Sequence, residues 1–286
     1  MGQTLTPLGL TPTPISGVGL GLRAPHYSTI LEQQPAVPWF EVLIDNYFCK
    51  GGQALKRLEA VRQHYPITFH SVGMSLGSSN PLNQDYLKQL KHLINVFEPT
   101  YVSDHLCWSA VDSYFLHDLL PLPYKSNVVT YVADRIQQVQ DCLGRRLLLE
   151  NVSSYLGYKE SVMQEWEFLL RIVERADCDI LLDINNIYVS ASNHDFNAND
   201  YLEAMPANRI KELHLAGYED QGTHLLDTHG EAIHEPVWQL YEQAIEKFGP
   251  IPTLVEWDNN IPGFDVLYAE GQKAEAILQQ GVRSVA

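Results

Sequence analysis

Side chains that bind metal ions recur in this sequence, most of them directly after a short apolar run. Six runs end in a histidine or a carboxylate, and one later loop adds one of each: His70, His105, Glu150, Asp183, His214, Glu256, Asp227 and His229. Asn186, close behind Asp183, adds an amide carbonyl. Imidazole and carboxylate ligands without thiolate suit iron, zinc or manganese. One ion takes about four to six ligands, so the set predicts two or three ions, with Glu150 or Asp183 as a bridge.

Each of these residues also has an ordinary structural interpretation. A single histidine at a strand end most often makes a structural hydrogen bond, and a carboxylate there often caps a helix. The joint pattern favours metal binding, because several carboxylates in one pocket cannot all stay ionised without cations. The sequence therefore predicts one multinuclear metal centre, provided that the fold brings these positions together.

The fold expected from the apolar runs is a closed α/β barrel. The runs that read as strands are 17–22, 39–44, 67–70, 101–105, 147–151, 180–184, 210–215 and 253–257. Most are continuously apolar, as parallel strands buried on both faces are. Amphipathic helical patterns lie between them at 54–64, 84–97, 126–143, 163–176 and 236–248. The alternation predicts a (β/α)8 TIM barrel, with an open parallel sheet as the alternative. A barrel gathers the loops that follow its strands at one end.

Composition and charge narrow the class of protein. The chain has 286 residues, 45% of them hydrophobic, which suits one barrel core. We expect a flexible, Pro/Thr-rich N-terminal arm over 1–14 and a single barrel domain over 15–286. No segment reads as a secretory signal or a membrane span. The formal net charge of -16 disfavours nucleic acid as a partner, because phosphate contacts need a positive face. The four cysteines lack metal-type spacing and read as reduced thiols of a cytoplasmic protein.

Three connections between the predicted elements are candidate functional loops. The segments 106–125 and 216–235 are long, and long loops inside a compact domain are usually functional. The segment 71–79 is rich in glycine and serine. Such a loop exposes backbone N–H groups that can hold a substrate carbonyl or carboxylate, and the alternative is a flexible loop without that role.

The same residues carry a resemblance to a known family. The sequence resembles the multinuclear iron-dependent oxygenases typified by the methanobactin biosynthesis enzyme, which have xylose-isomerase-like TIM barrels. The matching segments cover nearly the whole chain: 17–23, 40–47, 69–77, 103–108, 117–123, 148–155, 181–190, the run from His214, 227–230 and 255–258. The second strand's segment departs from the pattern, since Asp45 and Asn46 stand where the family has Glu-Asn.

The resemblance implies a function. It implies two or three iron ions and an O2-dependent reaction on a cysteine of a ribosomally synthesised precursor peptide. A small partner protein that recognises the peptide's leader is implied as well. The predicted metal ligands named above, Asn186 included, fall on the family's metal positions. Asn46, Ser75 and Asn151 are the candidate substrate contacts, and no residue is assigned a catalytic role.

Other functions fit parts of the pattern. The ligand order resembles that of zinc-dependent apurinic endonucleases, which are hydrolases with three metals in a barrel. The negative charge argues against this, as does Asn186 where that family has histidine. A sugar isomerase-like enzyme is disfavoured because no lysine lies at a strand end among the ligands. A non-enzymatic metal-binding scaffold is a further alternative, and it predicts saturated metals without O2 reactivity.

Overall fold

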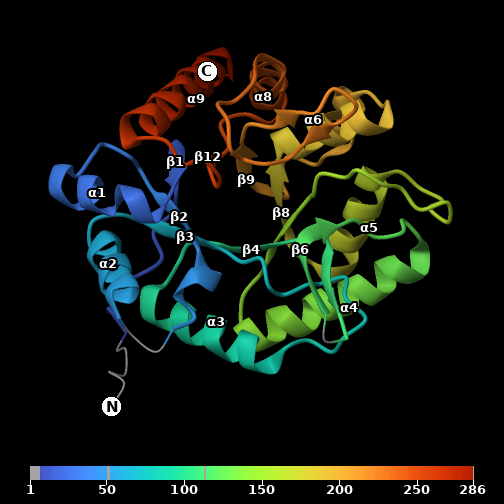
Figure 1. Cartoon of the computed structure of the whole chain (residues 1–286), viewed down its shortest axis with the longest axis horizontal. Helices are drawn as coiled ribbons and strands as arrows, with labels where there is room; N and C mark the ends of the chain where they lie inside the picture. Colours follow the sequence, from blue (N-terminus) through green and yellow to red (C-terminus); the bar gives the residue numbers. More distant parts are fainter. Residues whose placement is uncertain (1–6, 50–51, 113, 286) are drawn as a thin grey trace.

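Eight parallel strands close into a barrel at the centre of the protein. The computed structural model describes residues 7–49, 52–112 and 114–285. The strand order is β1-β12-β9-β8-β7-β4-β3-β2, and Figure 1 shows the helices arranged outside these strands. The strands are β1 Val18–Gly21, β2 Phe40–Leu43, β3 Ile67–His70, β4 Val102–His105, β7 Leu148–Glu150, β8 Asp179–Asp183, β9 Ile210–Leu215 and β12 Thr253–Val255. Each predicted strand is confirmed, and the open-sheet alternative is wrong because β1 pairs with both β2 and β12.

The helices include the predicted ones and others that the sequence analysis missed. Those predicted are α2 Gln53–Arg62, α3 Gln84–Phe97, α4 Ser126–Leu143, α5 Glu165–Ala176 and α8 Glu235–Phe248. Those missed are α1 Tyr27–Gln33, α6 Ile184–His194, α7 Ala198–Ala204 and α9 Phe264–Val285, with the 3-10 turns η1 Ala24–His26 and η2 Ile44–Tyr47. The start of α6 matters for function, because it follows β8 without a loop. Asp183 caps it by accepting a hydrogen bond from the backbone N–H of Asn186 at 2.7 Å.

Both long connections contain short hairpins rather than unstructured loops. The first holds β5 Trp108–Val111 and β6 Tyr114–Leu120, and the second holds β10 Glu219–Asp220 and β11 Leu225–Leu226. Both follow barrel strands, so they lie at the same end of the barrel as the predicted ligands. No helix in the part of the chain that the structure describes is long and apolar enough to cross a membrane.

Two further predictions concern the N-terminal segment and the cysteines. From residue 7 onward the segment contacts the barrel: the Leu8 N–H donates to the Val96 carbonyl at 3.2 Å, and the Thr100 hydroxyl donates to the Thr13 carbonyl at 2.6 Å. The predicted flexibility of residues 1–6 lies outside the described residues. All four cysteines are free thiols, as predicted.

The opposite end of the barrel is closed by Trp39. Its side chain is fully buried and packs with Ile15 and Leu254. The ring lies against Gly19 of β1 so closely that a β-carbon there would overlap the ring atoms. Glycine at this position therefore makes room for the indole that fills the barrel floor.

We expect Gly19→Ala to lower the free energy of unfolding by about 1–3 kcal/mol, because the added methyl group overpacks the floor. Denaturant titration of the metal-free protein measures this. Gly157→Ala is the matched control, since a β-carbon there meets nothing within 4 Å. It should leave stability unchanged or raise it slightly. Equal losses in both variants would refute the packing argument.

Candidate metal centre

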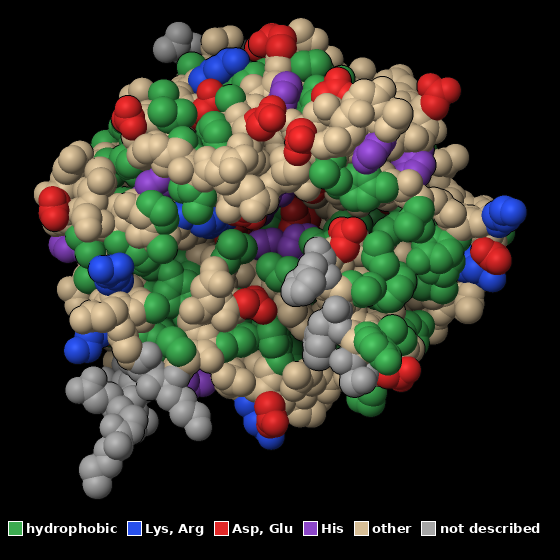
Figure 2. Space-filling model, in the orientation of Figure 1, with side chains coloured by type: hydrophobic (Ala, Val, Ile, Leu, Met, Phe, Trp, Pro, Cys, Tyr) green, Lys and Arg blue, Asp and Glu red, His purple; other side chains and the backbone are tan. Residues whose placement is uncertain are grey.

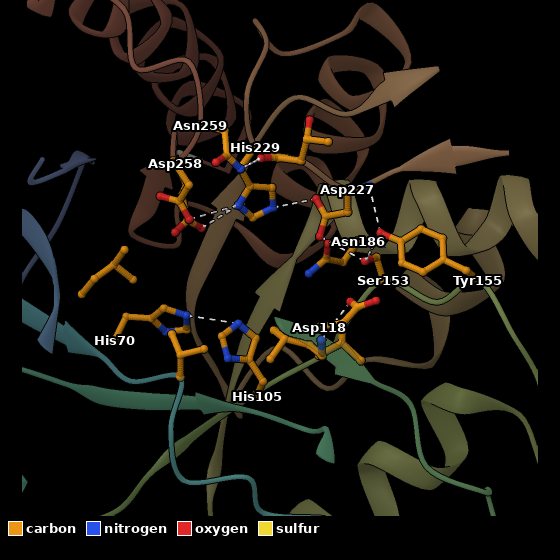
Figure 3. Close-up of a pocket in the computed structure, with 16 residues that line it drawn as sticks. His70, His105, Asp118, Ser153, Tyr155, Asn186, Asp227, His229, Asp258 and Asn259 are labelled. Atoms are coloured by element: carbon orange, nitrogen blue, oxygen red, sulfur yellow. Dashed lines mark hydrogen bonds and ion pairs between the residues drawn. The ribbon is translucent and has the colours of Figure 1, made fainter. Parts of the chain in front are cut away.

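The predicted ligands converge on one cavity at the end of the barrel where the strands terminate. The cavity has a volume of about 330 Å³. Its walls include His70, His105, Asn186, Asp227, His229 and Glu256. Figure 2 shows histidine and acidic side chains at the bottom of a central hollow, and Figure 3 shows His70 and His105 facing Asp227 and His229 across it. The barrel thus brings together side chains that are far apart in the sequence.

The first group of ligands comes from three neighbouring strands. His70 ends β3, His105 ends β4 and Glu150 ends β7. The Nε2 atoms of His70 and His105 lie 3.3 and 3.2 Å from Oε2 of Glu150, and 3.2 Å from each other. The other ring nitrogen of His70 is 2.7 Å from the Ser103 hydroxyl, which fixes the orientation of the ring. We call His70, His105 and Glu150 the His70 triad.

Two further groups adjoin the first. Glu150, Asp183 and His214 form the His214 triad, and Asp183, His229 and Glu256 form the His229 triad. In each triad the ligand atoms lie within 4.8 Å of one another. Glu150 is shared by the first two triads and Asp183 by the last two. The arrangement is a chain of three adjacent candidate sites joined by two carboxylates.

Several atoms in these triads are buried without a hydrogen-bond partner among the described residues. They are Oε2 of Glu150, Oδ2 of Asp183, Oδ1 of Asn186, Nδ1 of His214 and Nε2 of His229. A buried polar atom without a partner costs free energy, so native proteins seldom leave one. Here the atoms face one another across short gaps in poor geometry for hydrogen bonds. Imidazole nitrogens and carboxylate or carbonyl oxygens in this arrangement fit iron, zinc or manganese.

The loop ligands Asp227 and His229 are held by hydrogen bonds at the rim. Oδ1 of Asp227 lies 2.7 Å from Nε2 of His229 and accepts from the Asn185 amide at 2.8 Å. Oδ2 of Asp227 accepts from the Ser153 hydroxyl at 3.0 Å. The backbone N–H of Asp227 donates to the Tyr155 hydroxyl at 2.9 Å. These contacts place both predicted loop residues at the cavity.

Burial shifts the acid–base properties of the site. It raises the pKa of Asp183 to about 7 and that of Glu150 well above its usual value. It also lowers the pKa of His105 to about 4. For His214 burial acts in the same direction, but the Glu41, Glu212 and Glu256 carboxylates outweigh it and raise its pKa well above the usual value. The metal-free site therefore stores protons on Glu150, Asp183 and His214 near neutral pH.

Two buried glutamates below the cavity were not predicted. Glu41 of β2 and Glu212 of β9 are fully buried and form a fourth group with His214. Oε2 of Glu41 lies 3.1 Å from Nε2 of His214, whereas Oε1 of Glu212 lies 3.7 Å away. A weak sequence signal existed, because Glu41 is an acid inside an apolar run and Glu212 precedes His214 by the two-residue strand period.

An arginine behind the cavity wall was also missed. Nε of Arg23 donates to the Asp258 carboxylate at 2.8 Å, and its Nη2 donates to Oε1 of Glu256 at 3.1 Å. The other oxygen of Glu256 then faces Nδ1 of His214 at 3.1 Å. Although burial acts the other way, His214, His229 and Arg23 hold the pKa of Glu256 well below its usual value. Arg23 therefore keeps Glu256 ionised and aimed into the site.

The three candidate substrate contacts do not line this cavity. Asn46 is exposed on η2. The Asn151 side chain is buried and joins two strands, because its amide donates to the Asp183 carbonyl and its oxygen accepts from the Asp183 N–H. The Ser75 hydroxyl accepts from the N–H of Ser109 in the hairpin. The structure gives Ser75 and Asn151 supporting contacts within the protein.

The interpretation of 71–79 as a source of free N–H groups is wrong for Val72, Met74 and Gly77. The N–H of Val72 donates to the Asp45 carboxylate at 3.1 Å, and that of Met74 donates to the Asp104 carboxylate at 3.2 Å. The N–H of Gly77 donates to the Cys107 carbonyl at 2.8 Å. The loop is therefore fixed by the protein's own acceptors, and Asp45 acts in this role.

Comparison with known proteins shows the family to which this chain belongs. Residues 17–279 match the family of the RiPP precursor modification enzyme MbnB/TglH/ChrH. The chain belongs to the MbnB/TglH/ChrH family. Its relatives include a UPF0276 protein of Acaryochloris marina, 56% identical over 94% of this chain and 97% of that protein. Another is a UPF0276 protein of an Anaeromyxobacter species, 47% identical over 93% and 96%.

Solved structures show the fold of this MbnB/TglH/ChrH family member. Endonuclease IV from Thermus thermophilus superimposes with a TM-score of 0.61 at 16% identity, covering 93% of this chain and 100% of that one. A xylose isomerase-like TIM barrel protein from Mycobacterium smegmatis, solved in complex with magnesium, gives 0.58 at 12% identity, covering 97% and 100%. The xylose-isomerase-like TIM barrel is thereby confirmed.

Metal binding by this family member is expected to release protons. The metal-free site holds protons on Glu150 and His214 and in part on Asp183, and coordination requires the deprotonated forms. The loaded site binds fewer protons than the empty one, so metal affinity should rise with pH. Calorimetric titration with Zn²⁺ in two buffers of different ionisation enthalpy, at pH 6.5 and pH 8, counts the protons. Affinity that stays constant between these pH values would contradict the assignment.

Proposed function

We propose that this protein is an O2-dependent, multinuclear non-heme iron oxidoreductase that modifies a cysteine of a ribosomally synthesised precursor peptide. The observation that carries the proposal is the chain of three triads joined by Glu150 and Asp183. The family match supports the peptide as substrate. We further propose that the protein acts in the cytoplasm with a small partner that recognises the peptide's leader.

The nine predicted ligands would hold two or three iron ions. Bound iron supplies affinity for a thiolate sulfur and redox chemistry with O2. The protein's own contribution starts with the residues that hold the ligands in place: Ser103 fixes His70, Glu41 contacts His214, and Arg23 fixes Glu256. Such contacts set ring orientation and ligand basicity. Three adjacent triads at fixed spacing favour a multinuclear centre over a single saturated site.

The cavity suits one side chain of a peptide. Its volume of about 330 Å³ admits a cysteine side chain with neighbouring backbone. Asp258 lines the cavity, where its Oδ1 accepts a hydrogen bond from Arg23 and its Oδ2 lies 3.8 Å from Nδ1 of His229. Ser153 and Tyr155 hold the opposite wall through Asp227. Burial of the site excludes bulk water from the reacting cysteine.

The electrostatics of the cavity disfavour the hydrolase alternative. Asp118, Asp227, Asp258 and Glu256 are among its lining residues, which include no lysine or arginine among the described part of the chain. Recognition of a nucleic acid backbone rests on cationic side chains, which this lining lacks, so attraction for a phosphodiester would have to come from the bound metal ions alone. A neutral cysteine side chain needs no such compensation.

Elemental analysis and an assay test the proposal. Protein purified without oxygen should contain iron at two or three ions per chain. Iron-loaded protein mixed with its precursor peptide and O2 should change the mass of a cysteine-containing fragment, and zinc-loaded protein should not. Equal activity of the zinc-loaded protein would refute the redox mechanism and favour hydrolysis.

A further inference from the structure

A second pocket lies beside the metal cavity and has no part in holding the metals. Its volume is about 370 Å³. Aromatic rings of Tyr124, Tyr158, Trp166 and Phe196 line it together with the carboxylate of Glu165. We call it the aromatic pocket. It is formed by the segments that precede α4 and α5 and by the end of α6.

One extended segment forms the wall between the metal cavity and the aromatic pocket. Ser153 and Tyr155 line the cavity, whereas Ser154 and Leu156 line the aromatic pocket. The hydroxyl of Ser153 donates to Asp227, while that of Ser154 lies 2.7 Å from Nε2 of His194 on the other side. The side chains alternate as in a strand, so the two openings lie on opposite faces of a single backbone.

Glu165 gives the aromatic pocket a chemical preference. Its two carboxylate oxygens accept hydrogen bonds from the hydroxyls of Tyr124 and Tyr201, each at 3.1 Å. No basic side chain among the described residues forms an ion pair with it, and burial raises its pKa to about 7. Glu165 is the first residue of α5, where the positive end of the helix favours the ionised carboxylate. The pocket thus contains a carboxyl group whose ionised form has no countercharge among the described residues.

The rest of the lining also suits a cation. Asp195 adds a second carboxylate, and the described lining residues include no lysine or arginine. The rings of Trp166 and Phe196 pack with their centroids 5.5 Å apart. Aromatic faces attract ammonium and guanidinium groups, and the attraction grows when the cation loses water. A carboxylate beneath several aromatic rings binds the head of a basic side chain and packs its aliphatic stem.

We propose that the aromatic pocket is a specificity subsite that takes a lysine or arginine side chain of the precursor peptide, within about four residues of the modified cysteine. The spacing follows from the shared wall, because an extended peptide advances about 3.3 Å per residue and must cross one backbone between the two openings. This inference deepens the proposed function and rests on it for the identity of the ligand as a peptide. Leu156, an exposed apolar side chain of the lining, offers further contact to a bound chain.

Binding of synthetic peptides tests the subsite. The probes are fluorescein-labelled nonapeptides with a central cysteine in a Gly/Ser background. A single lysine occupies each of the four positions before and after the cysteine in turn, and matched sets carry norleucine or glutamate there. Fluorescence anisotropy is measured against the zinc-loaded full chain. At one position we expect lysine to bind about tenfold or more tightly than norleucine, because its ammonium group forms a charge-assisted hydrogen bond with the Glu165 carboxylate.

Variants of the protein test whether the preference for lysine over norleucine arises in the aromatic pocket. Glu165→Gln should abolish the advantage of lysine over norleucine. Glu167→Gln is the matched control, because Glu167 lies on the same helix, pairs with Arg171 at the surface and is absent from the lining. Leu156→Arg places a cationic side chain at the exposed rim of the aromatic pocket without disturbing the core. This side chain should compete with the lysine of the peptide, so that binding of the lysine peptide is selectively weakened.

Distinct results would overturn the inference. Tighter binding of norleucine at that position would make the pocket an apolar subsite. A lysine advantage that survives Glu165→Gln, or the absence of measurable binding by every lysine peptide, would also refute it. Because binding is measured with zinc and needs no turnover, failure of the iron-dependent reaction would leave this readout unchanged, and the two proposals can fail separately.

Discussion

Replacing Glu150 by glutamine is expected to remove two adjacent metal sites at once and to reduce the rate of peptide modification more than about 100-fold. Glu150 belongs to both the His70 and the His214 triads, and its two oxygens face different partners. An amide supplies one neutral oxygen in place of two anionic ones. Loss of a residue that only hydrogen-bonds a metal ligand typically costs about 10–100-fold, so loss of a shared ligand should cost more.

The fold should tolerate Glu150→Gln. Burial keeps the Glu150 pKa well above its usual value, which favours the protonated carboxyl in the metal-free protein, and glutamine resembles that form. The metal-free variant should therefore unfold within about 1 kcal/mol of the metal-free wild type. Added metal should stabilise the variant less than it stabilises the wild type, because a protein that binds a ligand more weakly gains less stability from it.

Elemental analysis and thermal unfolding with and without metal check this prediction. Metal content should fall to at most one ion per chain, that of the His229 triad. Glu203→Gln serves as the control, because Glu203 lies at the surface in an ion pair with Lys247. A Glu150→Gln protein that retains full metal content and activity would remove the bridging role and with it the basis for a multinuclear centre.

The sequence predicts the barrel and most of the candidate centre because both rest on local patterns. Continuous apolar runs indicate buried parallel strands, and the ends of parallel barrel strands meet at one place. Glu150 and Asp183 follow such runs directly, so their convergence requires no knowledge of loops. The same reasoning explains why Glu256 was found, although β12 ends one residue before it.

Other features depend on pairings that no local pattern contains. The substrate contact predicted for Asn151 stays a prediction, and the structure adds that both ends of its amide hydrogen bond to the backbone of Asp183 on the next strand. The hairpin β5–β6 depends on cross-strand contacts inside what reads as a loop. Glu41 was missed because an acid inside an apolar strand has meaning only once the barrel interior is known to hold His214 beside it.

Glu41 therefore allows a test of how the barrel interior supports the metal centre. We expect Glu41→Leu to weaken metal binding and peptide modification by about 10–100-fold, although Glu41 lies outside the cavity lining. Its Oε2 is 3.1 Å from Nε2 of His214, and this contact directs Nδ1 toward Glu150 and Glu256. Without it the ring loses its fixed orientation and the basicity that a carboxylate partner gives an imidazole ligand.

Two measurements distinguish a positioning role of Glu41 from a role in folding. They are the stability of the Glu41→Leu variant and the metal affinity of a variant at the neighbouring Glu212. Leucine removes one partner of the buried pair between Glu41 and His214, so the metal-free protein should lose stability as well as function, and denaturant titration must show that the variant is folded before its metal affinity is compared. Glu212→Leu removes a similar side chain from the same chamber, but the Glu212 carboxylate lies 3.7 Å from Nε2 of His214, beyond the usual length of a hydrogen bond. Its effect on metal affinity should stay below about threefold, well under the loss expected when a hydrogen-bonded partner of a ligand is removed. Equal losses in the two variants would show that the chamber's overall charge, and not the contact between Glu41 and His214, sustains the metal centre.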